Sequence, residues 1–181
     1  MKDPEETILR NFKSKIEALK LPYPYNRMIK EVKFQIDKEW SIDENKVLTF
    51  PFDFDQSEQN EKDFRTGILH ELTHLLLGHP FYTPKHPLAK YFYEMACEIE
   101  VACFLKERFK IPYPAWLSGI IKNGWPSKGR LIKVQGKDAF ELTYELLENE
   151  ELKPCFSKDL IDNQKFLRKT VFQKFKEFQK I

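Results

Sequence analysis

The spacing of apolar side chains changes twice within the first fifty residues. Apolar residues first recur every three or four positions, at Ile8, Phe12, Ile16 and Leu19. This spacing predicts a helix over residues 5–20. From residue 32 they alternate with polar residues, which predicts a half-buried strand over residues 32–36. A polar turn at residues 41–45 leads to a second apolar strand at residues 47–50. Together the two strands are typical of an antiparallel hairpin.

Helical spacing returns after the two strands. An apolar stripe predicts a helix that begins at Asp55 or Ser57 and runs to about Leu77, where Gly78 and Pro80 end it. A second helix is predicted from Pro87 to about Lys110. Two more are predicted over residues 138–148 and 158–180, with a loop-rich stretch over residues 112–129. The pattern predicts an α+β protein, mostly helical with a small antiparallel sheet.

Composition narrows the class of protein. The chain has 181 residues, 41% of them hydrophobic, which fits one packed domain over residues 1–181. Its 30 basic and 28 acidic side chains give a net charge of +2, so there is no strong nucleic-acid signal. No apolar run reaches the roughly 18–20 residues of a membrane span, and no secretory signal is visible. The three cysteines lack C-x-x-C spacing and are typical of reduced thiols, so we expect a cytoplasmic protein.

Three of the four histidines lie within ten residues, in the run His70-Glu71-Leu72-Thr73-His74-Leu75-Leu76-Leu77-Gly78-His79. The pattern H-E-x-x-H on a helix is the zinc site of many metallopeptidases. Residues four apart share a helix face, so His70 and His74 can bind one ion together. Glu71 lies about 100° round the helix from His70, where its carboxylate can act as general base on a water held by that ion.

A catalytic zinc ion usually takes three protein ligands, so a third residue is needed. Glu94 and Glu98 share a helical stripe that continues into apolar residues and so faces the interior, where a carboxylate needs a cation or hydrogen-bond donors. Either one can be the ligand, with the other orienting a histidine or lying beside the bound water. His79 ranks third, because only a break at Gly78 would turn it back towards the ion. It is otherwise expected to cap the helix end or contact substrate, and Glu100 is expected on a solvated face.

These motifs give the chain a resemblance to a family of zinc metallopeptidase domains often found N-terminal to a von Willebrand factor A-like domain. The family's first motif, about H-E-x-x-H-x-x-L-G-H-P, is matched over His70–Pro80. Its second motif, N-x-A-x-D-x-x-V-N, corresponds to Glu94–Ala102, and the similarity covers about residues 30–147. The acidic position common to both is Glu98, which favours Glu98 as ligand. The spacing of Glu94 and Glu98 is also similar to that of gluzincin peptidases, in which the first Glu binds zinc.

The resemblance implies a single zincin-like metallopeptidase domain with the H-E-x-x-H motif on its active-site helix. It implies Zn²⁺ as cofactor and hydrolysis of a peptide or protein substrate by a zinc-activated water, with Glu71 as general base. Tyr82, Tyr91 and Tyr93 are candidate donors to the oxyanion. The strand at residues 46–50 is the candidate sheet edge for the substrate strand.

The alternative function is a catalytically silent zincin-fold binding or regulatory module that acts through a protein partner. A basic amphipathic helix over about residues 158–180 is the expected contact for such a partner, although a helix of this kind more often packs on its own domain. The aromatic stretch Trp116–Trp125 is expected either to line a substrate pocket or to cover the core. Glu71 favours the enzyme, because a scaffold has no use for a general base.

Overall fold

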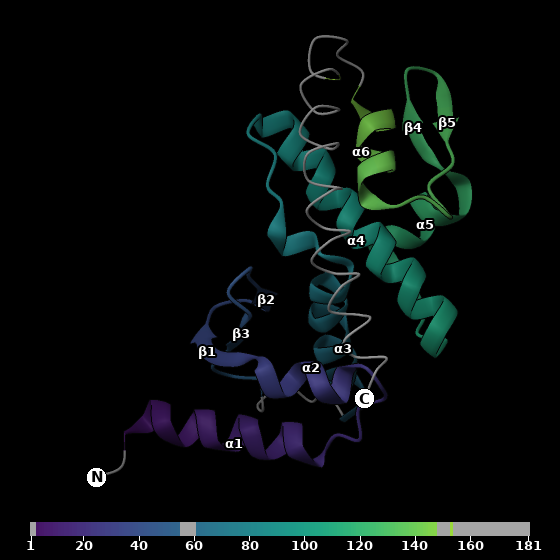
Figure 1. The fold of residues 1–181 in the computed structure, drawn as a ribbon. Helices are drawn as coiled ribbons and strands as arrows, with labels where there is room; N and C mark the ends of the chain where they lie inside the picture. The colour runs from purple at the N-terminus through teal and green to yellow at the C-terminus, as the bar shows by residue number, and fades with distance from the viewer. Residues whose placement is uncertain (1–2, 55–60, 148–152, 154–181) are drawn as a thin grey trace, which may run out of the picture. The chain divides into compact units, whose positions relative to one another are not determined.

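The structure, a computed structural model, describes residues 3–54, 61–147 and 153. The chain divides into two compact units, Met1–Phe81 and Tyr82–Ile181. The first unit contains α1 (Pro4–Ala18), α2 (Tyr25–Glu31), β1 (Lys33–Asp37), β2 (Ser41–Ile42), β3 (Val47–Pro51), α3 (Glu61–Leu77) and the 3-10 helix η1 (His79–Phe81). The second contains α4 (Pro87–Phe109), α5 (Ala115–Asn123), β4 (Trp125–Ser127), β5 (Arg130–Ile132) and α6 (Ala139–Leu146) (Figure 1). One domain over residues 1–181 stays a prediction.

The sheet of the first unit has the strand order β1-β3-β2. β1 pairs with β3 in parallel, and the short β2 pairs with β3 antiparallel. The predicted antiparallel hairpin of the first two strands is therefore wrong, and β3 is the central strand rather than the edge. The physical reason is a tight turn after β2, in which the Asp43 carboxylate accepts hydrogen bonds from the backbone N–H groups of Asn45 and Val47. This turn joins β3 to β2, so β1 takes the other side of β3.

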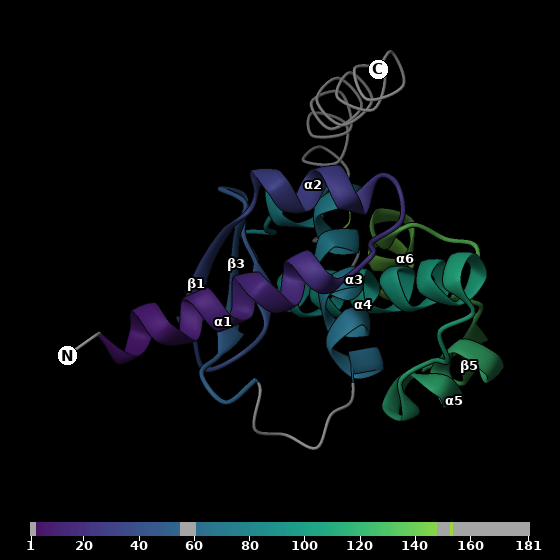
Figure 2. The same ribbon diagram turned by 90° about the horizontal axis from the view of Figure 1, so that it is seen from below.

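Phe12 of α1 lies at the centre of an aromatic core in the first unit. Its ring stacks on Phe50 of β3 with 3.6 Å between the ring centroids, and it meets Phe54 edge-on at 5.1 Å. Phe12 and Phe50 are both fully buried. Figures 1 and 2 both show α1 beside β1, as the contacts between these elements require. Large buried rings dominate the energetics of such a small core, so this cluster holds α1 on the sheet.

α3 buries an apolar face formed by Ile68, Leu69 and Leu72, which are fully buried. Thr73 on the same helix is also fully buried, and its Oγ1 donates a hydrogen bond to the carbonyl oxygen of Leu69 at 2.6 Å. The Tyr25 hydroxyl of α2 then donates to Thr73 Oγ1 at 2.9 Å. A buried hydroxyl needs such a partner, and this pair fixes α3 against α2.

The end of α3 follows the prediction. The last residue is Leu77, and Gly78 adopts the left-handed region with φ 82°, which glycine adopts without steric cost. The backbone N–H of Gly78 donates to the carbonyl oxygen of Leu75 at 3.2 Å. The chain then turns into η1, which begins at His79. The predicted beginning at Asp55 or Ser57 lies outside the described residues, and α3 is described from Glu61.

In the second unit the predicted long helix is confirmed as α4. Its N-cap is His86, whose Nδ1 accepts a hydrogen bond from the backbone N–H of Leu88 at 3.2 Å, and Pro87 is the first helical residue. The helix ends at Phe109, followed by Lys110 with φ 59°. α4 packs against α6 within the unit. His86, expected in a loop, thus has a capping role.

The predicted short helix over residues 138–148 is confirmed as α6. Its N-terminus carries a capping box, in which the Asp138 carboxylate accepts from the backbone N–H of Glu141 at 2.8 Å. Glu100 of α4 is half-buried, and its carboxylate accepts from the backbone N–H of Ala139 at 2.8 Å. The predicted solvated position of Glu100 is therefore wrong. The backbone N–H of Ala139, at the start of α6, has no acceptor within its own helix, and its hydrogen bond to Glu100 holds this carboxylate in a half-buried position.

The predicted loop over residues 112–129 contains regular structure. Residues 115–123 form α5, and Lys128 and Gly129 with φ 43° and 76° make the two-residue turn of a hairpin between β4 and β5. Trp125 lies 6.3 Å from Phe92 between ring centroids, whereas Trp116 is 56% exposed. Trp125 therefore packs on an aromatic residue of α4 and helps to cover the core of the second unit, whereas Trp116 faces solvent.

The prediction of a mostly helical α+β protein is confirmed, with a mixed rather than antiparallel three-stranded sheet. The helix predicted over residues 5–20 is α1. The basic helix predicted over about residues 158–180 lies outside the described residues. Within the described ranges, no helix combines the length and the apolar character needed to cross a membrane.

Candidate metal centre

His70 and His74 lie one turn apart on the same face of α3. Their Nε2 atoms are 3.1 Å apart, and their ring centroids are 4.8 Å apart with the planes at 64°. Both side chains are half-buried, in contrast to the buried apolar face of the same helix. Two neutral imidazoles whose Nε2 atoms converge in this way can donate their lone pairs to one cation.

Glu71 is buried, with 8% of its surface exposed, although it is a charged residue. Burial of an ionised carboxylate is costly unless a cation or hydrogen-bond donors lie nearby. Its position next to His70 in the chain puts it at the border between the histidine face and the buried face of α3. A cation held by the two histidines would add to the interactions that stabilise this carboxylate.

His79 lies next to Nδ1 of His74, on the other side of the ring from the Nε2 atom that converges with Nε2 of His70. Its Nδ1 is 3.0 Å from Nδ1 of His74, and the two ring centroids are 5.1 Å apart. The break in the helix at Gly78 brings His79 to this place, where only 6% of it is exposed. The two ring nitrogens of His74 therefore have different neighbours, with Nε2 towards His70 and Nδ1 towards His79.

The carboxylates of α4 differ in their surroundings. Glu94 is 63% exposed on its side chain and lies 3.7 Å from Nζ of Lys90 in an exposed ion pair. Glu98 is half-buried. Among the described residues, His70, His74 and Glu98 each offer one ligand atom, and these atoms all lie within 4.8 Å of one another. Neither Glu94 nor His79 belongs to this group.

The donor set of this group fits a metal ion. Two imidazole nitrogens with one carboxylate form a known set for catalytic zinc. Two nitrogens bound to one zinc ion in a tetrahedral arrangement are roughly 3.3 Å apart, close to the 3.1 Å between the Nε2 atoms of His70 and His74. Because imidazole also suits copper, iron and nickel, the geometry fits a metal ion without selecting which metal.

The three tyrosines predicted as oxyanion donors fall into two groups. Tyr91 is 53% exposed, whereas Tyr82 and Tyr93 are buried. The rings of Tyr82 and Tyr93 meet at right angles 5.1 Å apart, and both pack on Phe140. Burial raises the pKa of the Tyr93 hydroxyl above its usual range, which keeps it neutral. A role in catalysis stays a prediction for each of them.

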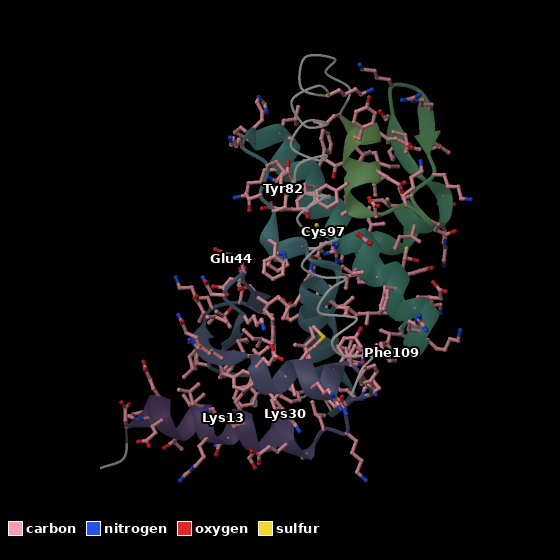
Figure 3. All side chains as sticks on the ribbon, viewed as in Figure 1. Lys13, Lys30, Glu44, Tyr82, Cys97 and Phe109 are labelled. Carbon is pink, nitrogen blue, oxygen red and sulfur yellow. The ribbon has the colours of Figure 1, made fainter. Side chains whose placement is uncertain are left out.

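Cys97, labelled with Tyr82 in Figure 3, is a buried free thiol on α4. Desolvation raises the pKa of Cys97 well above the usual range, and it also raises the pKa of the half-buried Cys103. Only a thiolate is a good nucleophile or metal ligand. Both side chains therefore behave as packing residues, while Cys155 lies outside the described residues.

The chain matches no family model, no curated protein and no solved structure. The resemblance to zinc metallopeptidase domains thus rests on the motifs at His70–Pro80 and Glu94–Ala102 alone. The fold and the site define a coarser class, a mostly helical α+β protein with a His-His-Glu group that can hold a metal ion.

Proposed function

We propose that this protein is a zinc-dependent metallopeptidase of the zincin type, with His70, His74 and Glu98 as metal ligands and Glu71 as general base. The observation that carries the proposal is the convergence of the two Nε2 atoms, 3.1 Å apart, beside a buried glutamate in the H-E-x-x-H sequence. A structural pair of histidines would not need that glutamate, whereas hydrolysis needs it as a base.

Glu98 is the preferred third ligand on the grounds of exposure. Water competes less strongly with a partly buried carboxylate for a metal ion than with an exposed one. Glu98 is half-buried. Glu94 faces solvent beside Lys90, and an exposed ion pair of this kind contributes little to stability. The acidic position shared with the resembling family is also that of Glu98.

Zinc held by these residues supplies a Lewis acid that polarises a substrate carbonyl and lowers the pKa of water to about 7. Glu71 takes up the proton of the attacking water on its carboxylate and passes it to the leaving amine. Because Glu71 is buried, its charge is screened less than that of a surface glutamate. The Nε2 atoms of His70 and His74 converge on one point, so a metal ion held there would fix the position from which the water attacks the substrate carbonyl.

The proposed substrate is an extended peptide or a protein segment. Extended segments add to a sheet by pairing with an edge strand. β3 is central, so the edge next to α3 is β2, which contacts that helix within the first unit. A segment paired with β2 would run beside the helix that carries Glu71.

The test is the metal content and the peptidase activity of the same protein. Full-length chain purified without chelator and without nickel resin is analysed by mass spectrometry for metals and assayed on a mixed peptide library. We expect about one zinc ion per chain and cleavage products that disappear in Glu71→Gln, with the zinc content unchanged. A loss of roughly 10²–10⁴-fold in rate is expected for removal of a general base.

Two outcomes contradict the proposal. Wild-type protein that takes up no metal, even after zinc is added back, would rule out a metallopeptidase. Equal cleavage by wild type and Glu71→Gln would remove the role of Glu71. A chain that binds zinc but cleaves nothing in the library would favour the alternative, a binding module that acts through a protein partner.

A further inference from the structure

The hydrogen bond between His74 and His79 has a direction that metal binding would determine. A neutral imidazole carries its single proton on one ring nitrogen and offers a lone pair on the other. If Nε2 of His74 binds a metal ion, its proton must be on Nδ1. The atom 3.0 Å from that Nδ1 is Nδ1 of His79, which must then accept the hydrogen bond and carry its own proton on Nε2.

From this geometry we propose that His79 is a positioning residue, which accepts the Nδ1 proton of His74 and so holds the Nε2 lone pair of His74 on the metal. Histidine ligands almost always donate their second ring N–H to a carboxylate, a carbonyl or a water, and such partners orient the ring and select its tautomer. In the first unit of this chain that acceptor is a third imidazole. The proposal rests on the proposed metal site but not on peptidase activity.

The local structure explains how a residue five positions after His74 reaches it. On an unbroken helix a fifth residue lies about 140° round the axis, away from the first. The positive φ of Gly78 ends α3, and η1 begins at once with His79. The buried ring of His79, 6% exposed, then contacts Nδ1 of His74. Burial shields this hydrogen bond from competing water, which makes it effective in holding the His74 ring.

The same contacts link metal binding to the position of a proton. Nε2 of His74 lies 3.1 Å from Nε2 of His70, and Nδ1 lies 3.0 Å from His79. Without metal, the single proton of His74 can bridge to either neighbour. With metal on both Nε2 atoms, the ion replaces the hydrogen bond between His74 and His70, while the hydrogen bond between His74 and His79 stays in place. Metal binding would therefore select the tautomer of His74 in which His79 accepts the proton on Nδ1.

Two substitutions separate this role from simple packing. Asn places its side-chain oxygen near the position of a histidine Nδ1 and can accept the same hydrogen bond, whereas Leu fills a similar volume without an acceptor. We expect His79→Leu to weaken zinc affinity roughly 10- to 100-fold, as loss of an outer-shell partner does. His79→Asn should stay within about threefold of wild type. His86→Asn, at the remaining histidine, is the matched control and should leave the affinity unchanged.

The experiment is competition for zinc against a chromophoric chelator, with circular dichroism to confirm that each variant is folded. Long-range ¹H–¹⁵N NMR of zinc-loaded protein labelled on histidine reads the tautomers directly. We expect a proton on Nδ1 of His74 and on Nε2 of His79. A proton on Nδ1 of His79 in the loaded protein overturns the inference, and so does a folded His79→Leu that binds zinc as tightly as wild type.

The outcomes distinguish this inference from the proposed function. Complete loss of zinc in both His79→Leu and His79→Asn would make His79 a ligand and overturn its positioning role, while the metal site stands. Wild-type protein that binds no zinc would overturn both proposals. Zinc binding with the expected order of the variants, in a protein that cleaves no peptide, would support the role of His79 and contradict only the peptidase.

Discussion

The Nε2 atoms of His70 and His74 lie 3.1 Å apart on one half-buried face of α3, while Nδ1 of His74 lies 3.0 Å from His79. Two protonated imidazoles so close together would repel each other, since like charges within about 4–6 Å disfavour the charged forms. Neutral rings with converging lone pairs are instead stabilised by a shared cation. The arrangement is therefore expected to gain stability when a metal ion binds.

Zinc should raise the melting temperature of the wild-type chain. A ligand that binds only the folded state stabilises it by about 2.7 kcal/mol at 100 times its Kd. Because about 1 kcal/mol shifts a chain of this size by roughly 2–4 °C, we expect a shift of roughly 5–10 °C in differential scanning calorimetry. His70→Ala and His74→Ala should melt at the same temperature with and without zinc, and His86→Asn should keep the shift. A shift that survives both alanine variants would place the zinc elsewhere.

Glu98 and Glu94 form a matched pair for testing the third ligand, because they are one turn apart on α4 and differ in exposure. Glu98→Gln should weaken zinc binding by more than roughly 100-fold, beyond the range of an outer-shell change. Glu94→Gln removes only an exposed partner of Lys90 and should leave the affinity within about twofold. Competition with a chelator measures both. The reverse order would make Glu94 the ligand.

Features that depend on residues close together in the chain could be predicted from the sequence, whereas features that depend on distant residues could not. His70, Glu71 and His74 are related by one helical turn, so their spacing alone placed them on one helix, and the periodic stripes of α1, α3 and α4 were equally visible. α2 was missed because it has seven residues after a proline-rich stretch, too few for a periodic stripe. The parallel pairing of β1 with β3 was missed because alternation shows that a strand is half-buried and not which neighbour it takes.

The choice between Glu94 and Glu98 could not be predicted from the sequence either. Glu94 and Glu98 share one helical stripe in the sequence, and periodicity could not say which turn of that stripe faces solvent. The structure shows Glu94 exposed beside Lys90 and Glu98 half-buried. Glu100 was likewise misplaced, because its attraction to the backbone N–H of Ala139 joins segments 39 residues apart. Such contacts follow from tertiary packing and leave no pattern along the chain.

The buried hydrogen bond between Tyr25 and Thr73 should stabilise the first unit measurably. The two hydroxyl oxygens lie 2.9 Å apart, and both residues are almost fully buried. Tyr25→Phe should lower the free energy of unfolding by about 1 kcal/mol, because Thr73 then loses a buried donor. Tyr23→Phe, at a residue that is 50% exposed, is the control and should change little. Urea unfolding measures both variants.

A double-mutant cycle tests whether the two hydroxyls act together. If they do, Tyr25→Phe combined with Thr73→Val should cost less than the sum of the single changes, with a coupling energy of about 0.5–1 kcal/mol. The bond from Thr73 to the carbonyl of Leu69 is lost in both arms of the cycle and cancels. Strict additivity would mean that α2 and α3 are held together by packing alone.

Asp138, the N-cap of α6, should make the stability of the chain depend on pH. Desolvation by burial raises the pKa of its carboxyl above the ordinary value, although the hydrogen bond from the backbone N–H of Glu141 acts in the opposite direction. A raised pKa in the folded state means that the folded state binds the proton more tightly than the unfolded state. Stability contributed by Asp138 is therefore present below its unfolded pKa and is lost as pH rises through the folded pKa.

Two substitutions distinguish the pH dependence caused by Asp138 from its role as helix cap. Asn caps a helix as well as Asp does but carries no charge, so Asp138→Asn should be at least as stable as wild type at pH 7. Its advantage should shrink as pH falls through the folded pKa of Asp138, where the wild-type carboxyl takes up a proton. Asp138→Ala should be less stable than Asp138→Asn by about 1 kcal/mol at both pH 4 and pH 7, since the cap itself is gone. Urea unfolding at pH 4 and pH 7 measures all three chains, and an advantage of Asn that grows in acid would show that the pKa of Asp138 is lowered by folding.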